Sequence, residues 1–247
     1  MARTQDKPPA TLQVAPVQRK ATHLEVLTKL GDEIRAGRLL AGDRLPPERL
    51  LSEMLNVSRN SLRESLAILE AVGVIRSQAG SGPRAGTFVL SEPGTAMNEI
   101  LALQVQLNQF DISDVIEFRR SIENMAVTKL ASNPECHDLS MAEALIEEST
   151  HITSPDEFAR LDMDFHVGLV RLGGNRLSSY MVQMCRVVLE DRMVAGFKTL
   201  DSWDSARLVF IEQHRAIVES VKEGAVDQAS QALLRHITGP AGFRSIS

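Results

Sequence analysis

The sequence predicts a mainly α-helical protein with an N-terminal three-helix module, closed by a β-hairpin, and a C-terminal all-α helical bundle of six to seven helices. Three observations lead to this fold class. Apolar residues recur at three- and four-residue spacing through most of the 247 residues, as on the buried face of a helix. Two short β-type segments enclose a Gly-rich stretch before residue 90. Beyond residue 95, no segment alternates as a strand does.

The N-terminal module is predicted from three apolar stripes and the residues that end them. Helices are expected over 22–37, 47–55 and 58–72. Their apolar residues are Leu24, Leu27, Leu30 and Ile34 in the first, Leu51, Met54 and Leu55 on the buried side of the second, and Leu62, Leu66 and Leu69 in the third. Ser58 is a good N-cap, Asn56 suits a left-handed turn, and Gly73 stops the third helix. Segments 74–76 and 87–90 then form a hairpin.

The C-terminal bundle follows a Pro- and Gly-bearing linker at 91–95. Its helices are expected over 97–109, 111–132, 137–150, 154–171, 175–197, 202–222 and 224–237. The resulting domains are a disordered tail at 1–20, an N-terminal domain at 21–90, the linker, a C-terminal domain at 96–238 and a second tail at 239–247.

Charge also separates the two modules. Residues 1–90 hold 13 of the 27 Lys and Arg residues and 9 of the 32 Asp and Glu residues, which gives net +4 there and net −9 in the rest. A basic N-terminal module suits a polyanionic partner. Its only aromatic residue is Phe88, so a surface that stacks single-stranded bases is disfavoured and duplex DNA stays open.

Several function classes are excluded by composition. No stretch without Asp, Glu, Lys or Arg exceeds 11 residues, whereas a membrane-spanning helix needs about 20 apolar residues. The polar N-terminus lacks the apolar core of a secretory signal, so we expect a cytoplasmic protein without a membrane partner. Two cysteines, Cys136 and Cys185, cannot make a disulfide framework or a thiolate zinc cluster.

A helix, a short turn and a Ser-capped second helix form the physical core of a helix-turn-helix, whose second helix enters the major groove of DNA. At 100° per residue, Asn60 and Arg63 lie opposite the leucine face, and Arg59 lies in the first turn. Arginine can grip guanine edges or phosphates, and Asn60 or Ser61 can add hydrogen bonds. The pattern alone leaves a second interpretation open, the solvated face of an ordinary three-helix bundle.

Residues 37–89 resemble the GntR family of winged-helix transcription regulators. The resemblance is carried by GDRLP-x-ER-x-L, by L-x-VSR-x-x-x-RE-x-L-x-x-LE-x-x-G and by a closing GTFV, in that order. It implies a winged helix-turn-helix in which Arg49, Arg59 and Arg63 contact operator DNA. It further implies that the wing, through Gly86 and Thr87, reaches the minor groove.

A second set of residues, in the acidic half, has the chemistry of a metal site. Asp162 and His166 are four apart on one helix face, and His214 and His236 lie in later helices. Three imidazoles and a carboxylate suit Zn²⁺, Ni²⁺, Co²⁺ or Mn²⁺. Spacing alone leaves open that the pair is a salt bridge, an N-cap or a satisfied core histidine.

Residues 95–238 resemble the all-helical FCD ligand-binding domain of the FadR-type branch of the same family. The motifs are EFRRSIENMAVTKLA, DMDFH, GGNRL, EQHRAI and GAVDQASQALLRHI. The resemblance implies a divalent metal ion on Asp162, His166, His214 and His236, and an effector carboxylate on Arg119. Some FadR-type relatives bind acyl-CoA without metal, but the retained ligand set favours a small organic or sugar acid.

The combined expectation is a homodimeric transcription regulator, a repressor rather than an activator, that reads a short inverted repeat of double-stranded DNA and releases it under effector control. Two alternatives remain: a metal-dependent hydrolase or lyase tethered to DNA, and a regulator whose C-terminal domain only dimerises. No general base or nucleophile stands out beside the metal set, so an enzyme is not expected.

Overall fold

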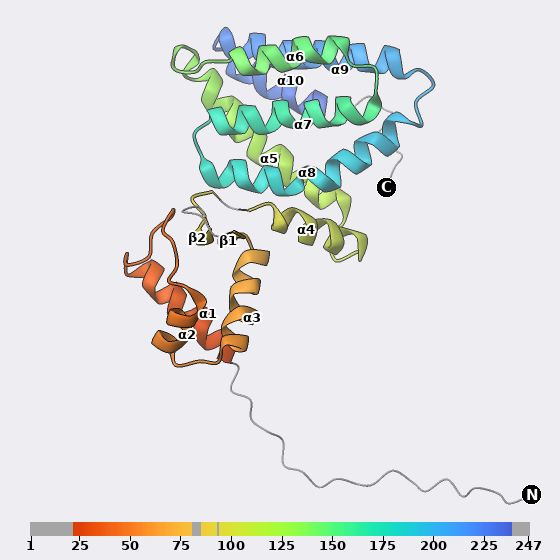
Figure 1. Ribbon diagram of the computed structural model, residues 1–247. Helices are drawn as coiled ribbons and strands as arrows, with labels where there is room; N and C mark the ends of the chain where they lie inside the picture. Colours follow the sequence, from red (N-terminus) through yellow and green to blue (C-terminus); the bar gives the residue numbers. More distant parts are fainter. Residues whose placement is uncertain (1–21, 81–84, 93, 239–247) are drawn as a thin grey trace, which may run out of the picture. The chain divides into compact units, whose positions relative to one another are not determined.

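The computed structural model describes residues 22–80, 85–92 and 94–238. The tails expected at 1–20 and 239–247 lie outside the described residues. The chain divides into two compact units on either side of the bond between Glu92 and Pro93, within the expected linker (Figure 1). Among the described helices, none is both long and apolar enough to cross a membrane.

Unit 1 is a winged helix-turn-helix. Its elements are α1 Thr22–Arg35, α2 Glu48–Leu55, α3 Arg59–Ala71, β1 Ile75–Gln78 and β2 Gly86–Val89. The strands are antiparallel, with Ile75 opposite Val89 and Gln78 opposite Gly86. The segment before α2 runs alongside the other edge of β2, where the Leu45 amide donates to the Thr87 carbonyl at 2.8 Å. The predicted hairpin is therefore confirmed.

Local chemistry fixes the turn between α2 and α3. Asn56 adopts the left-handed conformation with φ 53°, and the Ser58 hydroxyl accepts the amide hydrogen of Ser61 at 3.1 Å. Both features match the sequence expectation. Pro47 occupies the N-cap of α2 rather than its first helical position. The turn holds α3 at a set angle to α2.

The core of unit 1 differs in detail from the predicted stripes. Its buried side chains are Val26, Leu30, Leu45, Leu51, Leu62, Leu66, Ile75 and Val89. In α1, Leu24 and Ile34 are exposed, because the buried stripe passes through Val26 instead. Met54 was expected to be buried and is 65% exposed. The buried stripe of α2 runs from Leu51 toward Ser52, whose hydroxyl is satisfied by the Arg49 carbonyl, and this leaves Met54 outside it.

Unit 2 is all helical over its described residues. It contains α4 Ala96–Gln106, α5 Ile112–Ala131, the 3₁₀ turn η1 Pro134–Cys136, α6 Ser140–His151, α7 Pro155–Leu172, α8 Arg176–Phe197, α9 Trp203–Lys222 and α10 Val226–Thr238. These seven α-helices confirm the predicted bundle. The 3₁₀ turn was not predicted; it forms where Asn133-Pro134 ends α5.

The packing of unit 2 places α5, α7, α9 and α10 around one interior. Helix α7 contacts α5, α6 and α8, while α10 contacts α5 and α9 (Figure 1). The core between them contains four buried phenylalanines, Phe158, Phe165, Phe197 and Phe210. The helices from α5 to α10 therefore surround a buried interior, and the predicted metal ligands lie on three of them.

The burial of Leu51 and the exposure of Met54 on α2 give a stability prediction. Leu51→Ala should lower the free energy of unfolding by about 2–5 kcal/mol, because it leaves a cavity in the core of unit 1. Met54→Ala, three residues away on the same helix, should change it by about 0.5 kcal/mol or less. Urea unfolding followed by circular dichroism measures both. Equal losses in the two variants would contradict the observed orientation of α2.

Candidate functional site

Helix α7 brings the first two predicted ligands together. The Ser154 hydroxyl accepts the Glu157 amide at the N-cap, and Pro155 occupies the first turn, so the helix starts where the sequence predicts. Asp162 and His166 follow one turn apart and are 1% and 0% exposed. His214 on α9 and His236 on α10 are equally enclosed, at 1% and 5%.

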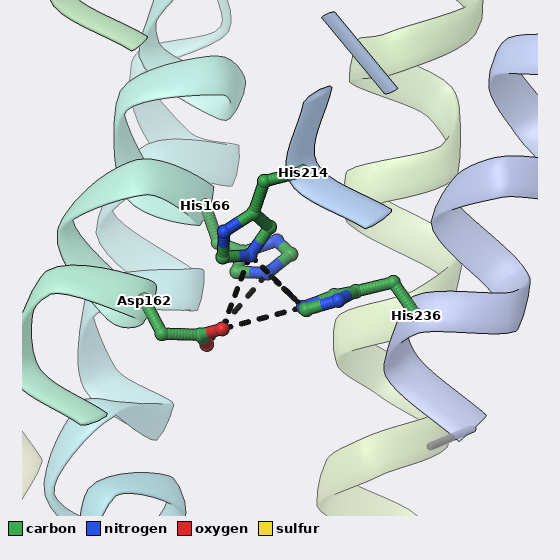
Figure 2. A group of neighbouring side chains, drawn as sticks. All are labelled: Asp162, His166, His214 and His236. Carbon is green, nitrogen blue, oxygen red and sulfur yellow. Dashed lines mark hydrogen bonds and ion pairs between the residues drawn. The ribbon is translucent and has the colours of Figure 1, made fainter. Parts of the chain in front are cut away.

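The four side chains point at one another (Figure 2). His166 Nε2 and His214 Nε2 lie 2.9 and 3.2 Å from His236 Nε2. Asp162 Oδ1 is 3.1 Å from His214 Nε2 and 3.3 Å from His236 Nε2. One donor atom from each residue falls within 4.8 Å of all the others. The structure thus brings together the complete predicted set.

In each neutral histidine, the group that contacts Nδ1 helps to decide whether Nε2 carries the ring proton or a lone pair. His166 Nδ1 lies 2.6 Å from Glu123 Oε2, and His236 Nδ1 lies 3.1 Å from Gln213 Oε1. An oxygen acceptor at Nδ1 favours the proton there and leaves Nε2 as a lone pair. Two lone pairs then face each other across 2.9 Å. That arrangement is unfavourable unless a cation lies between them, and it fits a metal ion.

Sequence reasoning missed Glu123. This α5 residue is 1% exposed and divides its carboxylate between two partners. Oε1 accepts from Arg119 Nε at 2.5 Å, while Oε2 faces His166 Nδ1. A carboxylate behind a ligating histidine is a common orienting group in metal sites. The i,i+4 spacing from Arg119, inside the EFRRSIE motif, is the signal that could have identified it.

Arg119 lies beside the cluster rather than on the surface. It is 5% exposed, and its Nη2 lies 3.8 Å from Asp162 Oδ2. Nη2 has no hydrogen-bond acceptor among the described residues. A buried guanidinium nitrogen without an acceptor is costly, and a bound anion would satisfy it.

The cluster has the protonation state that a metal ion requires. Burial lowers the pKa of His166, His214 and His236, so all three imidazoles are neutral at pH 7. Burial opposes ionisation of Glu123, but Arg119 and His166 outweigh it and lower its pKa to about 2. The pKa of Asp162 is likewise held well below its ordinary value, against burial, by the neighbouring histidines, His166 above all.

These states leave the buried cluster with a net charge of −1, from the Asp162 and Glu123 carboxylates and the Arg119 guanidinium. Buried charge that is not compensated is strongly destabilising. A divalent cation among three neutral imidazoles and one carboxylate is the compensation that this donor set fits.

A pocket of about 100 Å³ adjoins the cluster. Arg119, Asp162 and His236 form part of its lining, and the remaining side chains are Ile112, Ile116, Leu189, Arg192, Met193, Phe197, Phe210 and Ile237. A small molecule in this pocket would meet the guanidinium and the ligand set together.

Four of the predicted DNA-contacting residues are exposed polar or charged side chains on α2 and α3. Arg59, Asn60 and Arg63 are exposed on α3, as is Arg49 on α2. Arg63 Nε pairs with Glu48 at 2.7 Å, and Arg49 pairs with Glu53 at 3.1 Å. Exposed pairs of this kind contribute about 0–1 kcal/mol, so a phosphate or base edge can replace the carboxylate.

The polar residues of the DNA-contacting set are engaged locally. The Asn60 amide donates to Glu64 at 3.0 Å, and the Ser61 hydroxyl lies 2.9 Å from that of Ser58. Ser61 is half-buried, and its backbone amide donates to the Ser58 hydroxyl at the helix cap. Either side chain can still meet DNA at the start of α3, where the helix dipole is positive.

The wing residues Gly86 and Thr87 are half-buried at the start of β2. Gly86 has φ 137°, and a Cβ there would lie 2.5 Å from Arg44 Nε. Glycine is therefore required by the fold as well as implied by the family motif. The tip of the wing, residues 81–84, lies outside the described residues.

The lowered pKa values predict how stability depends on pH. The ordinary pKa of histidine is 6.5. As the pH falls below this value, these histidines become protonated in the unfolded chain but stay neutral in the folded chain, where their pKa is lower. The free energy of unfolding of the metal-free protein should therefore fall, by up to about 1.4 kcal/mol per pH unit for each group. His214→Gln should reduce this slope, whereas His151→Gln, at an exposed position, should leave it unchanged. Urea unfolding between about pH 7.5 and 5.5 measures the slope. A slope that His214→Gln leaves as in the wild type would contradict the lowered pKa of this group.

Comparison with known proteins assigns both units to families. Residues 22–89 match the gntR family of bacterial regulatory proteins, and residues 114–239 match the FCD domain. The chain is 28% identical to the HTH-type transcriptional repressor NanR of Escherichia coli K12 over 247 residues, which cover 96% of this chain and 90% of NanR. It is 27% identical to the HTH-type transcriptional regulator LutR of Bacillus subtilis strain 168 over 208 residues, which cover 83% and 93%.

A solved structure supports the same fold. The GntR protein of Streptococcus agalactiae superposes with a TM-score of 0.63 at 23% identity, covering 87% of this chain and 97% of that one. Both matched families consist of transcription regulators rather than enzymes. The chain therefore belongs to the GntR family of DNA-binding transcription regulators, in the FadR-type branch whose C-terminal unit is an FCD domain.

Proposed function

We propose that this regulator is a homodimeric repressor that holds a divalent metal ion in unit 2 and releases its operator when a small carboxylic acid binds beside that ion. The observation that carries the proposal is the convergence of three imidazoles and one carboxylate, within 4.8 Å, in a buried cluster.

The metal ligands are Asp162, His166, His214 and His236. Zn²⁺, Ni²⁺ and Mn²⁺ suit such a nitrogen and oxygen set, which leaves coordination positions for an effector. Glu123 and Gln213 lie behind the ligands: each places a side-chain oxygen close to a histidine Nδ1, which favours the proton there and leaves Nε2 directed inward. When bound, the ion supplies positive charge and open coordination positions.

The effector is proposed to be an acid because of the charge balance. A divalent ion changes the net charge of the cluster from −1 to +1, and one carboxylate then makes it neutral. Arg119 Nη2, which lacks an acceptor among the described residues, supplies the second contact to that carboxylate.

Unit 1 is proposed to read duplex DNA with α3 in the major groove. Arg63 and Asn60 face base edges, Arg49, Arg59 and Ser61 contact phosphates or adjacent bases, and Gly86 and Thr87 bring the wing to the minor groove. Two copies of unit 1 in a dimer suit a short inverted repeat. Exposed apolar side chains of unit 2, such as Leu103 on α4 and Leu107 just after it, supply surface that a partner copy can bury.

Repression is proposed because steric block of a promoter needs no further contact, and because the relative NanR is a repressor. A tenfold change in operator affinity corresponds to about 1.4 kcal/mol, which is within the range of ordinary allosteric coupling. Since the operator is chromosomal DNA, the cytoplasm is the proposed place of action.

A regulator whose C-terminal unit only dimerises is the second candidate. It would need no cation, yet a cluster evolved only for packing would bury fewer ionisable groups. Metal content therefore separates the two candidates.

Metal binding gives the most direct test of the sensor. Tag-free protein should hold about one divalent ion per chain by elemental analysis, because four ligands converge on one point. His214→Ala should lose the ion while circular dichroism shows an intact fold. Glu123→Gln should keep the ion but with about 10–100-fold weaker affinity, because the orienting carboxylate is lost.

The matched control for the metal test is His151→Ala, which removes an exposed histidine 76% accessible at its side chain. It should bind metal as the wild type does. Wild-type metal affinity in His214→Ala would contradict the ligand assignment and favour the dimerisation-only candidate.

The proposed base contact of Arg63 predicts a loss of operator affinity when this side chain is removed. Arg63→Ala should weaken binding to the operator by about 1–3 kcal/mol and bring it closer to binding of unrelated duplex, because a base contact is removed. Arg35→Ala, which removes an equally exposed and ion-paired arginine of α1, should leave the preference intact. Footprinting upstream of the gene locates the operator, and fluorescence anisotropy measures both variants. Unchanged specificity in Arg63→Ala would remove it from the base-reading set.

A further inference from the structure

We infer that the outer face of the wing sheet carries two further contacts to DNA phosphates, Arg44 and Arg76, and that Phe88 and Gly86 hold Arg44 in position for its contact. The inference rests on the proposed reading of duplex DNA by unit 1. It adds two arginines to the predicted set of DNA-contacting residues. It comes from the register of the three extended segments in the wing.

Three residues lie in a row across the wing. Arg76 on β1 is the register partner of Phe88 on β2, and Arg44 forms an antiparallel bridge with Phe88 from the other edge of that strand. Cross-strand partners direct their side chains to the same face of a sheet. Arg76, Phe88 and Arg44 therefore share one face, and we call this row the wing strip.

The wing strip faces away from the core of unit 1. Each of its members adjoins a buried residue in the sequence: Ile75, Val89 and Leu45 are 2%, 7% and 4% exposed. Successive side chains of an extended segment point to opposite faces, so the strip occupies the outer face. Both arginines are exposed, and Phe88 is half-buried between them. One surface thus presents two guanidinium groups to solvent.

Arg44 is held against the sheet by two of its neighbours. Its Cζ lies 6.0 Å from the centre of the Phe88 ring, a cation–π distance. Two residues earlier on the same face of β2, Gly86 leaves room for the guanidinium, since a Cβ there would lie 2.5 Å from Arg44 Nε. A side chain that is ordered before binding loses less conformational entropy on binding. Phe88, the only aromatic residue among residues 1–90, therefore has a role that needs no stacking on bases.

Neither arginine of the wing strip has a carboxylate partner among the described residues. Other arginines of unit 1 do have one: Arg35, Arg38, Arg49 and Arg63 pair with Asp32, Glu33, Glu53 and Glu48. The strip can therefore bind an anion without displacing a carboxylate. Since neighbouring strands lie about 4.8 Å apart, the two arginine backbones on either side of β2 are about 10 Å apart. Duplex DNA, with one phosphate charge per about 1.7 Å of its axis, can place a phosphate at each.

The wing strip continues the surface that is proposed to read bases. Arg44 lies four residues before Glu48, whose carboxylate is 2.7 Å from Arg63 on α3. Four residues span at most about 14 Å, and the major groove that α3 would enter is about 12 Å wide. A duplex with α3 in its major groove can therefore bring a bordering phosphate backbone to the strip. Contacts of this kind position a protein on DNA without reading its sequence.

The test is the salt dependence of DNA binding by the full-length protein, measured by fluorescence anisotropy between about 0.05 and 0.3 M KCl. Arg44→Gln and Arg76→Gln keep most of the side-chain stem and remove the charge. Each should weaken binding to the operator and to unrelated duplex alike. Each should also reduce the slope of log K against log salt by about one for each bound chain. Arg44→Lys should keep the wild-type slope, because it keeps the charge.

Arg38→Gln is the matched control, because it removes the same charge from an arginine whose side chain is 63% exposed and pairs with Glu33. It should leave the slope as in the wild type. A wild-type slope in both Arg44→Gln and Arg76→Gln, or an equal reduction in Arg38→Gln, would overturn the inference.

An acidic protein surface is the other partner that two arginines could meet, since acidic side chains outnumber basic ones beyond residue 90. That case predicts a wild-type salt slope in both variants together with a changed oligomeric state or unfolding midpoint, and it would overturn the phosphate assignment. Failure of the underlying DNA reading has a separate signature, because the wild-type protein would then bind neither the operator nor unrelated duplex.

Discussion

The interior of unit 2 is governed by the cost of burying charge. Asp162, Glu123 and Arg119 are each at most 5% exposed, and with neutral imidazoles around them they leave one negative charge uncompensated. In a low-dielectric interior such a charge requires a nearby cation. Three Nε2 atoms point inward and can supply ligands for one, and the oxygens of Glu123 and Gln213 behind His166 and His236 favour that orientation of these two rings.

The groups that create the need for a cation come from distant parts of the chain and meet at one place in unit 2. The proposed ligands come from α7, α9 and α10, and Glu123 comes from α5, so four helices contribute to a single cluster of ionisable groups. A ligand that enters beside that centre contacts α5 through Arg119 and α8 through the apolar wall. Binding can then change how these helices pack, because packed cores shift between discrete arrangements rather than deform continuously. In the proposed dimer, such a shift would alter the affinity for the operator.

The sequence predicted most of the fold because its local signals agree with the tertiary structure. Ser58 and Ser154 cap helices with their side-chain hydroxyls, and Asn56 adopts a left-handed turn, all of which are local signals that a single sequence reveals. Burial is less local: Met54 and Leu24 are apolar yet exposed, since the stripe that faces the core depends on how neighbouring helices pack. The spacing of Asp162 and His166 was visible as one helix face, but their meeting with His214 and His236 depended on tertiary packing and was anticipated only through family resemblance. The role of Glu123 depends on a contact across helices, between α5 and α7, that periodicity cannot show.

The central claim is that one divalent ion lies among Asp162, His166, His214 and His236. Anomalous diffraction at the absorption edge of the bound metal, from crystals of metal-loaded protein, tests it most directly. The account predicts a single strong anomalous peak within bonding distance of the three Nε2 atoms and an Asp162 oxygen, at about 2.0–2.2 Å if the ion is zinc. A metal-loaded crystal whose anomalous peaks all lie away from this cluster would contradict it.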